Sequence, residues 1–243
     1  MESINIFKRQ ELKFILTDEQ AAAMNILFNK YMQPDTYSDY LVQSIYFDTD
    51  NWNIIRASIE KPTYKEKMRL RCYGIPGQNS TMFLELKKKY RGVVHKRRIS
   101  FPVEELNHRT AREIAAASAS ITGRELNKHF ETHPVSEKVH ISYKRKAYSN
   151  GNDLRITCDI DLKFRTSELD YQNPNDGLDI ISKALTIMEI KTLGGMPMWL
   201  AQALSKLRIF PTSFSKYGVG YKKHILQLED GGIGSWIILP KAL

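Results

Sequence analysis

A basic residue stands at every second position of the stretch 65–71, and these residues are Lys65, Lys67, Arg69 and Arg71. In a β-strand their side chains point to one face, about 6.5–7 Å apart along the strand. Such a row of cations repels itself unless an anion lies beside it, so the row could bind the oxygens of a phosphate chain. For one strand alone, a solvated outer face of an antiparallel sheet is an equally ordinary explanation.

Similar rows of cations, with a few carboxylates among them, recur on other predicted strands. The cations are Lys65, Lys67, Arg69, Arg71, Lys87, Lys89, Lys96, Arg145, Arg155 and Lys191, and the carboxylates are Glu11, Glu85, Asp159, Asp161 and Glu189. A water-facing sheet should mix both signs, because opposite cross-strand pairs stabilise it by about 0.2–1 kcal/mol and like pairs destabilise it. The excess of cations therefore favours a face that binds a polyanion. A carboxylate beside Lys or Arg could also hold Mg²⁺ or Mn²⁺ for phosphoryl transfer.

Alternating apolar residues predict the strands that must position these side chains. The strands cover residues 4–16, 41–48, 64–73, 82–90, 93–101, 135–149, 153–164 and 187–192. Helices are predicted at 17–31, 102–118, 121–130, 197–207 and from 214 onward, and a short helix or a turn at 52–58. The first of them starts at Thr17 and Gln20, which have the spacing of a capping box. This order of elements is typical of the α+β class with a mostly antiparallel sheet.

Two architectures fit strands that are apolar on one face and charged on the other. An open sheet would pack its apolar face on helices and show its charged face to water. A closed barrel would place the apolar side chains under outer helices and the charges in its lumen. The cation bias favours the second arrangement, so we expect a closed antiparallel eight-stranded β-barrel with helices packed on the outside.

The composition is that of a soluble globular protein with an anionic partner. The 243 residues are 42% hydrophobic and carry a formal net charge of +9, which favours nucleic acid, phosphate compounds or an acidic membrane surface. Cys72 and Cys158 are expected to be buried free thiols. The six histidines, His129 and His133 among them, show no metal-binding spacing. No signal peptide and no apolar run of about 18–20 residues is evident, so we expect a cytoplasmic protein without a membrane span.

Six short motifs follow one another in an order that is informative as a set. They are Arg9-x-Glu11-x-Lys13, Lys67-x-Arg69-x-Arg71-x-Tyr73, Glu85-x-Lys87, Arg155-x-x-x-Asp159, Glu189-x-Lys191 and Phe214-Ser215-Lys216-Tyr217. Together they resemble the VTC domain, the polyphosphate polymerase domain of the vacuolar transporter chaperone complex and its bacterial relatives. The resemblance runs from about residue 7 to about residue 222. It implies a single VTC-like domain over 1–243, with 223–243 as a C-terminal tail.

The resemblance implies a triphosphate tunnel metalloenzyme fold and transfer of the ATP γ-phosphate to a growing polyphosphate chain. It implies catalytic roles for Arg69, Arg71, Glu189 and Lys216. It implies phosphate binding, for ATP and for polyphosphate or triphosphate, by Lys13, Lys67, Arg69, Arg71, Lys87, Lys96, Tyr143, Arg145, Arg155, Lys191, Ser215 and Lys216. Glu189 would hold Mg²⁺ or Mn²⁺, and Glu11 and Glu85 would be second metal ligands or charge-balancing partners. Asp159 is expected to pair with an arginine.

Two positions depart from related patterns, and alternative functions stay open. Triphosphate hydrolases of the CYTH branch begin with Glu-x-Glu-x-Lys, and Arg9 in place of the first Glu favours the polymerase branch. Ser213 stands where the VTC pattern usually has a phosphate-contacting Lys. The alternatives are a triphosphatase of the same fold and a non-catalytic polyphosphate-binding module. Nucleic acid is not expected, because the cationic strands carry no aromatic stacking platform.

Overall fold

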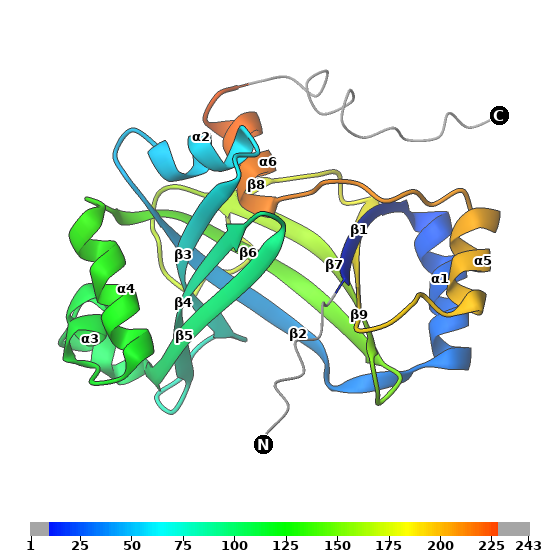
Figure 1. Ribbon diagram of the computed structural model, residues 1–243, viewed down its shortest axis with the longest axis horizontal. Helices are drawn as coiled ribbons and strands as arrows, with labels where there is room; N and C mark the ends of the chain where they lie inside the picture. Colours follow the sequence, from blue (N-terminus) through cyan, green and yellow to red (C-terminus); the bar gives the residue numbers. More distant parts are fainter. Residues whose placement is uncertain (1–9, 228–243) are drawn as a thin grey trace.

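The computed structural model describes residues 10–227, which form one antiparallel sheet flanked by helices (Figure 1). The strands are β1 (Gln10–Thr17), β2 (Gln33–Asp48), β3 (Tyr64–Tyr73), β4 (Thr81–Tyr90), β5 (Val93–Pro102), β6 (Ser136–Ser149), β7 (Leu154–Arg165), β8 (Leu178–Asp179) and β9 (Leu185–Thr192). The helices are α1 (Asp18–Tyr31), α2 (Asn53–Ile59), the 3-10 helix η1 (Val103–Asn107), α3 (Ala111–Ala117), α4 (Ile121–Thr132), α5 (Met198–Lys206) and α6 (Lys216–His224). Arg9, the first residues of the predicted strand 4–16 and the tail from 228 onward lie outside the described residues.

The sheet is open, so the predicted closed eight-stranded barrel is wrong. Its nine strands run in the order β1-β9-β7-β6-β2-β3-β4-β5, with the short β8 beside β7, and β1 and β5 are the two edges. The segment that follows α5 occupies the free edge of β1, where the Thr212 backbone N–H donates to the Lys13 carbonyl oxygen at 2.7 Å. Since this bridge uses a backbone acceptor of β1, that part of the edge is not available to pair with β5.

Helix boundaries agree with local capping signals. The predicted capping box opens α1, where the Thr17 side chain accepts from the Gln20 N–H and the Gln20 side chain accepts from the Thr17 N–H. The single helix predicted at 102–118 is wrong, because η1 and α3 are separate elements there. Thr110 and Glu113 form a second capping box, which starts α3 anew within that range.

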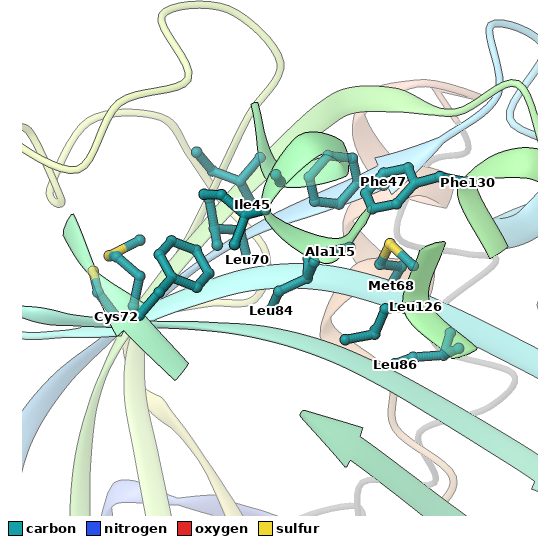
Figure 2. Close-up of a cluster of buried hydrophobic side chains, with 14 of the residues drawn as sticks. Ile45, Phe47, Met68, Leu70, Cys72, Leu84, Leu86, Ala115, Leu126 and Phe130 are labelled. Carbon is teal, nitrogen blue, oxygen red and sulfur yellow. The ribbon is translucent and has the colours of Figure 1, made fainter. Parts of the chain in front are cut away.

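Two apolar clusters attach helices to the outer face of the sheet. In the first, α3 and α4 cover β2 to β5, and Leu70, Leu84 and Phe130 lie in it (Figure 2). In the second, α1 and α5 cover β1, β7 and β9. The two helix pairs flank the sheet on opposite sides in Figure 1. Because side chains alternate across a strand, the charged positions of the same strands point to the other face, here called the inner face.

A third apolar cluster closes one end of the inner face. It joins α2 and α6 to side chains of β2, β6, β7 and β9, and Tyr217 and Phe164 are fully buried in it. The inner face is therefore apolar under α6 and charged over the remainder. No helix within residues 10–227 is long and apolar enough to cross a membrane.

The contact between α6 and β7 leaves no room for a side chain at Gly220. A Cβ atom built there would lie 2.3 Å from a ring carbon of Phe164, whereas one at Gly218 would meet nothing closer than 3.4 Å. Both substitutions by Ala gain the same helix propensity, so their difference isolates the overpacking. We expect Gly220→Ala to unfold with a free energy about 1–3 kcal/mol below that of Gly218→Ala in urea titrations followed by circular dichroism. Equal stabilities would contradict the packing of α6 on Phe164.

Candidate functional site

The register of β3, β4 and β5 gathers basic side chains on the inner face. Lys67 lies opposite Lys87, and Lys87 lies opposite Lys96. One step along, Arg69 lies opposite Glu85, and Glu85 lies opposite Arg98. The three strands thus present two adjacent rows, one entirely of lysines and one of two arginines around a single carboxylate.

Glu85 is the centre of the larger charge group, and its side chain is 1% exposed. Its Oε2 accepts from Arg69 Nε at 2.8 Å and lies 2.7 Å from Arg69 Nη2 and 3.8 Å from Arg71 Nη1. Its Oε1 contacts Lys96 Nζ and lies 4.0 Å from Arg98 Nη1. Burial alone would raise the pKa of Glu85, but Arg69, Arg71 and Lys96 outweigh it and hold the pKa at about 2. One ionised carboxylate thus faces four cations.

Arg71 connects this group to a second one around Tyr143. The buried guanidinium donates to Ser44 Oγ at 3.1 Å and to Tyr143 Oη at 3.5 Å. Lys216 Nζ lies 4.3 Å from the centre of the Tyr143 ring, and the Arg145 guanidinium lies 5.2 Å from it. Cations over an aromatic ring at these distances are attracted by its quadrupole. The ring therefore separates and stabilises three cations that would otherwise repel one another.

Asp159 anchors the second group, and its predicted pairing with an arginine is confirmed. Arg145 Nε and Nη2 donate to its two oxygens at 2.6 and 2.8 Å, and Lys216 Nζ donates to Oδ2 at 2.6 Å. Burial acts to raise the pKa of Asp159, but Lys216 and Arg145 lower it below its ordinary value. Since α6 starts at Lys216, this contact also fixes the start of that helix beside β6 and β7.

A third group joins β1 and β9. Lys13 Nζ lies 3.6 Å from Glu11 Oε1 and 3.8 Å from Glu189 Oε2, while Lys191 Nζ lies 2.7 Å from Glu189 Oε1. Glu11 and Glu189 are partly exposed, at 31% and 14% of their side-chain areas. Burial opposes ionisation of Glu189, but Lys191 and Lys13 lower its pKa. The ion-pair partners described for both carboxylates are lysines, not arginines.

The segment before α6 crosses the inner face from β1 to β3. Lys13 Nζ donates to the Phe214 carbonyl oxygen at 3.0 Å, and Lys67 Nζ donates to Ser215 Oγ at 3.0 Å. Ser215 also caps α6 by accepting from the Gly218 N–H at 3.2 Å. Residues far apart in the sequence, Lys13, Lys67 and Ser215, are therefore brought together.

The lysines of the inner face carry more positive charge than the neighbouring carboxylates balance. Burial lowers the pKa of Lys67, and the charges of Lys65, Lys13 and Lys87 lower it further, to about 8. Burial likewise lowers the pKa of Lys87 and of Lys96. An anion among these side chains would favour their charged forms.

Not every predicted site residue joins these groups. Arg155 points to the inner face near Lys191, but its Nε donates to Asp35 Oδ2 of β2 at 2.6 Å. Lys65 lies at the end of the row, 3.5 Å from the Ser58 carbonyl oxygen. A cavity of about 630 Å³ between Leu70 and Tyr171 is lined by none of the predicted site residues.

Sequence reasoning did not single out Arg98 and Tyr46. Arg98 is two residues beyond Lys96 on β5, so strand alternation alone could have placed it on the inner face. Tyr46 Oη accepts from Arg69 Nη1 at 2.9 Å. Burial would raise the pKa of Tyr46, but Arg69 and Arg71 lower it to about 8. No local signal marks Tyr46, because its partners come from another strand.

The sequence matches the family model described as "VTC domain" over residues 8–225. A comparison with curated proteins finds no significant match. Among solved structures, one protein of Pyrococcus horikoshii OT3 is 14% identical with a TM-score of 0.46, over 89% of this chain and 99% of that one. The Mimivirus capping enzyme triphosphatase is 10% identical with a TM-score of 0.34, over 82% of this chain and 85% of that one.

The Glu85 group predicts a specific dependence of stability on pH. Because the pKa of Glu85 is about 2 in the folded protein and 4.5 ordinarily, its contribution is complete above pH 4.5 and is lost as the pH falls toward 2. Glu85→Gln should lower the free energy of unfolding at pH 7 by about 3–5 kcal/mol and remove this part of the acid dependence. Urea unfolding at several pH values measures both effects.

Glu125→Gln is the matched control. Glu125 also binds two cations, Lys88 and Arg97, but on the outer face of the sheet, and its side chain is 29% exposed. Its loss should cost only about 0–1 kcal/mol. If the two variants were equally destabilised, Glu85 would not be the buried anchor described above.

Proposed function

The chain belongs to the VTC domain family, and from this premise we propose that its inner face binds a chain of phosphates and transfers the ATP γ-phosphate to polyphosphate. The observation that carries the proposal is the convergence of Arg69, Arg71, Lys96 and Arg98 on the single carboxylate of Glu85. So many cations around one buried anion leave a net positive charge in a poorly solvated place. A multiply charged anion offsets that cost, which a structural salt bridge alone would not need.

The arrangement of the groups supports a chain of phosphates as the ligand. Side-chain contacts link the groups of the inner face to one another. Arg71 of the Glu85 group contacts Tyr143, and Lys216 lies over the Tyr143 ring. Ser215, the neighbour of Lys216, accepts from Lys67. Arg69, Arg71 and Arg145 present planar guanidinium groups that suit bidentate contacts to phosphate oxygens. Lys67, Lys87 and Lys96 supply point charges between them. A linear anion can therefore contact several groups at once.

The family implies a divalent metal, and the residues present fit one at Glu11 and Glu189. Mg²⁺ and Mn²⁺ prefer oxygen ligands, and Mg²⁺ is often held by one or two carboxylates together with substrate phosphates. Glu11 and Glu189 are partly exposed, and Lys13 pairs with both of them. A bound phosphate could pair with Lys13 instead and leave the two carboxylates to a metal ion. Glu85 does not fit this role, because arginine and lysine side chains surround its oxygens. A bound metal would neutralise charge on the transferring phosphate.

The protein residues in this proposal bind and orient; none forms a covalent intermediate. A terminal oxygen of the polyphosphate attacks the γ-phosphorus of ATP, the bond to the β-phosphate oxygen breaks, and ADP leaves. The attacking oxygen is already an anion, so no strong general base is required. Arg69, Arg71 and Lys216 would hold the reacting phosphates in line and neutralise their charge, which is the main source of rate in phosphoryl transfer.

The direct test is incubation of the purified full chain with ATP and Mn²⁺, with and without a short polyphosphate primer. We expect polyphosphate and ADP on gels and by chromatography. Glu189→Ala and Arg69→Ala should each lower the rate of polymer formation by at least about 100-fold, since each removes a contact that neutralises transition-state charge. Absence of polymer in the wild-type reaction under both conditions would reject the polymerase proposal.

Incubation with triphosphate in place of ATP, and a titration with polyphosphate, discriminate the two alternatives. Release of free phosphate from triphosphate without chain growth would identify a hydrolase. Tight polyphosphate binding without turnover, unchanged in Glu189→Ala, would identify a binding module.

Two neighbouring arginines of β5 give a matched pair for phosphate binding. Arg98 and Arg97 have side chains 50% and 51% exposed, but Arg98 lies by Glu85 on the inner face and Arg97 by Glu125 on the outer face. Arg98→Ala should weaken tripolyphosphate binding by about 10- to 100-fold, since a hydrogen bond to a charged group contributes about 1.5–3 kcal/mol. Arg97→Ala removes the same charge and should leave binding nearly unchanged. Isothermal titration measures both, and equal losses would indicate attraction by overall charge rather than binding on the inner face.

A further inference from the structure

A cluster of two histidines and one carboxylate lies on the opposite side of β3 from the basic row. Glu66 belongs to the outward-pointing set of β3, and His129 and His133 stand four residues apart at the end of α4. Glu66 Oε1 lies 3.4 Å from His129 Nδ1 and 3.3 Å from His133 Nε2, and all three ligand atoms lie within 4.8 Å of one another. The elements that meet here are 63 residues or more apart in the chain, so sequence spacing did not reveal the cluster.

The two separations that involve Glu66 Oε1 match the edges of a metal coordination polyhedron. Nitrogen and oxygen ligands bind zinc at about 2.0–2.1 Å in a tetrahedron, which places neighbouring ligand atoms about 3.3–3.4 Å apart. Both contacts of Glu66 Oε1 have this length. They are longer than the charge-assisted hydrogen bonds that Asp159 makes elsewhere in the same protein, at 2.6–2.8 Å.

Outer contacts orient two of the three ligand atoms, those of Glu66 and His133. Tyr64 Oη donates to Glu66 Oε2 at 2.7 Å, which leaves Oε1 directed at the histidines. His133 Nδ1 lies 3.2 Å from the His129 carbonyl oxygen and 3.0 Å from Thr132 Oγ1. In the tautomer that donates from Nδ1 to this carbonyl, the lone pair of Nε2 faces Glu66. Metal-binding histidines and carboxylates are held by outer contacts of this kind.

The described polar contacts of Glu66 are with the two histidines and with Tyr64. Lys88, directly across from Glu66 on β4, binds Glu125 instead, at 2.7 Å. Both ion pairs that the described part of the chain gives Glu66 are with these histidines. The His129 side chain is only 2% exposed, and its Nε2 has no hydrogen-bond partner in the described part of the chain. The contact between Nδ1 and Glu66 is therefore the principal polar contact of this side chain.

A cavity gives this cluster access to solvent. Glu66 and His133 line a cavity of about 550 Å³ that extends along α2 past Asn53 and Ser58. The His133 side chain is 37% exposed. An ion could enter from this side, and a water molecule could occupy its fourth coordination position, as in zinc sites with three protein ligands.

We propose that Glu66, His129 and His133 form a binding site for a divalent transition-metal ion of the zinc type, on the outer side of the sheet. Imidazole nitrogen with one carboxylate suits Zn²⁺, Co²⁺ and Ni²⁺, whereas the all-oxygen pair Glu11 and Glu189 suits Mg²⁺ or Mn²⁺. The bound ion would link the end of α4 to β3. This proposal does not depend on what the inner face binds.

The test uses the full chain without a histidine tag, stripped with a chelator and titrated with Zn²⁺ against a colorimetric indicator in phosphate-free buffer containing excess Mg²⁺. We expect one Zn²⁺ per chain, a rise in the thermal unfolding midpoint on binding, and tetrahedral absorption bands with Co²⁺. His133→Ala and Glu66→Gln should each weaken Zn²⁺ binding by at least about 100-fold, and Tyr64→Phe by about 10-fold through the lost outer contact.

Two controls keep the outcome decisive. His108→Ala removes an exposed histidine outside the cluster and should leave affinity, stoichiometry and Co²⁺ spectrum unchanged. His133 is partly exposed, so circular dichroism of the metal-free His133→Ala protein should match that of the wild type. If the wild type binds Zn²⁺ no more tightly than His133→Ala or Glu66→Gln, or shows only octahedral Co²⁺ bands, the site does not exist. Polymer formation by Mn²⁺-loaded protein is scored separately, so failure of either proposal leaves the other standing.

Discussion

The burial of cations is the constraint on which this structure depends. Arg71 and Arg69 lie on the inner face of a sheet whose other face is covered by helices, where desolvation of a charge is costly. Two buried carboxylates, Glu85 and Asp159, make the arrangement possible, and Tyr143 joins their neighbourhoods. Neither carboxylate cancels all the positive charge around it. The fold can thus hold a basic face together. That face keeps an excess of positive charge, which favours the binding of an anion.

The segment before α6 joins strands that are distant in the sheet, as hydrogen bonds between the edge strands would in a closed barrel. Thr212 bonds to the edge of β1, Ser215 to Lys67 of β3, and Lys216 to Asp159 of β7. Because α6 also packs against Phe164, these contacts connect the apolar packing of the helix to the charged side chains of the inner face. An open sheet can therefore hold residues from β1, β3 and β7 around one place without a hydrogen bond between its edge strands.

Strand β3 separates two chemistries by alternation alone. Its odd-numbered residues, such as Lys67 and Arg69, supply cations to the inner face, and its even-numbered residues supply apolar side chains to the cluster under α3 and α4. Glu66 is the polar exception in the second set and lies where the last turn of α4 presents two histidines. One strand thus presents a basic row on one side and a cluster of one carboxylate and two histidines on the other.

The sequence by itself determined the features that are local. Alternation placed the basic rows of β3 and β4 on one face, and the Thr17–Gln20 spacing located the start of α1, because both depend only on neighbouring residues. The order of short motifs also indicated the family, which the match over residues 8–225 confirms. Only the tertiary structure decided that the sheet is open, that Tyr46 joins the basic face, and that Glu66 meets His129. Sheet closure depends on what occupies an edge, and these contacts join side chains from separate elements, so no local pattern could specify them.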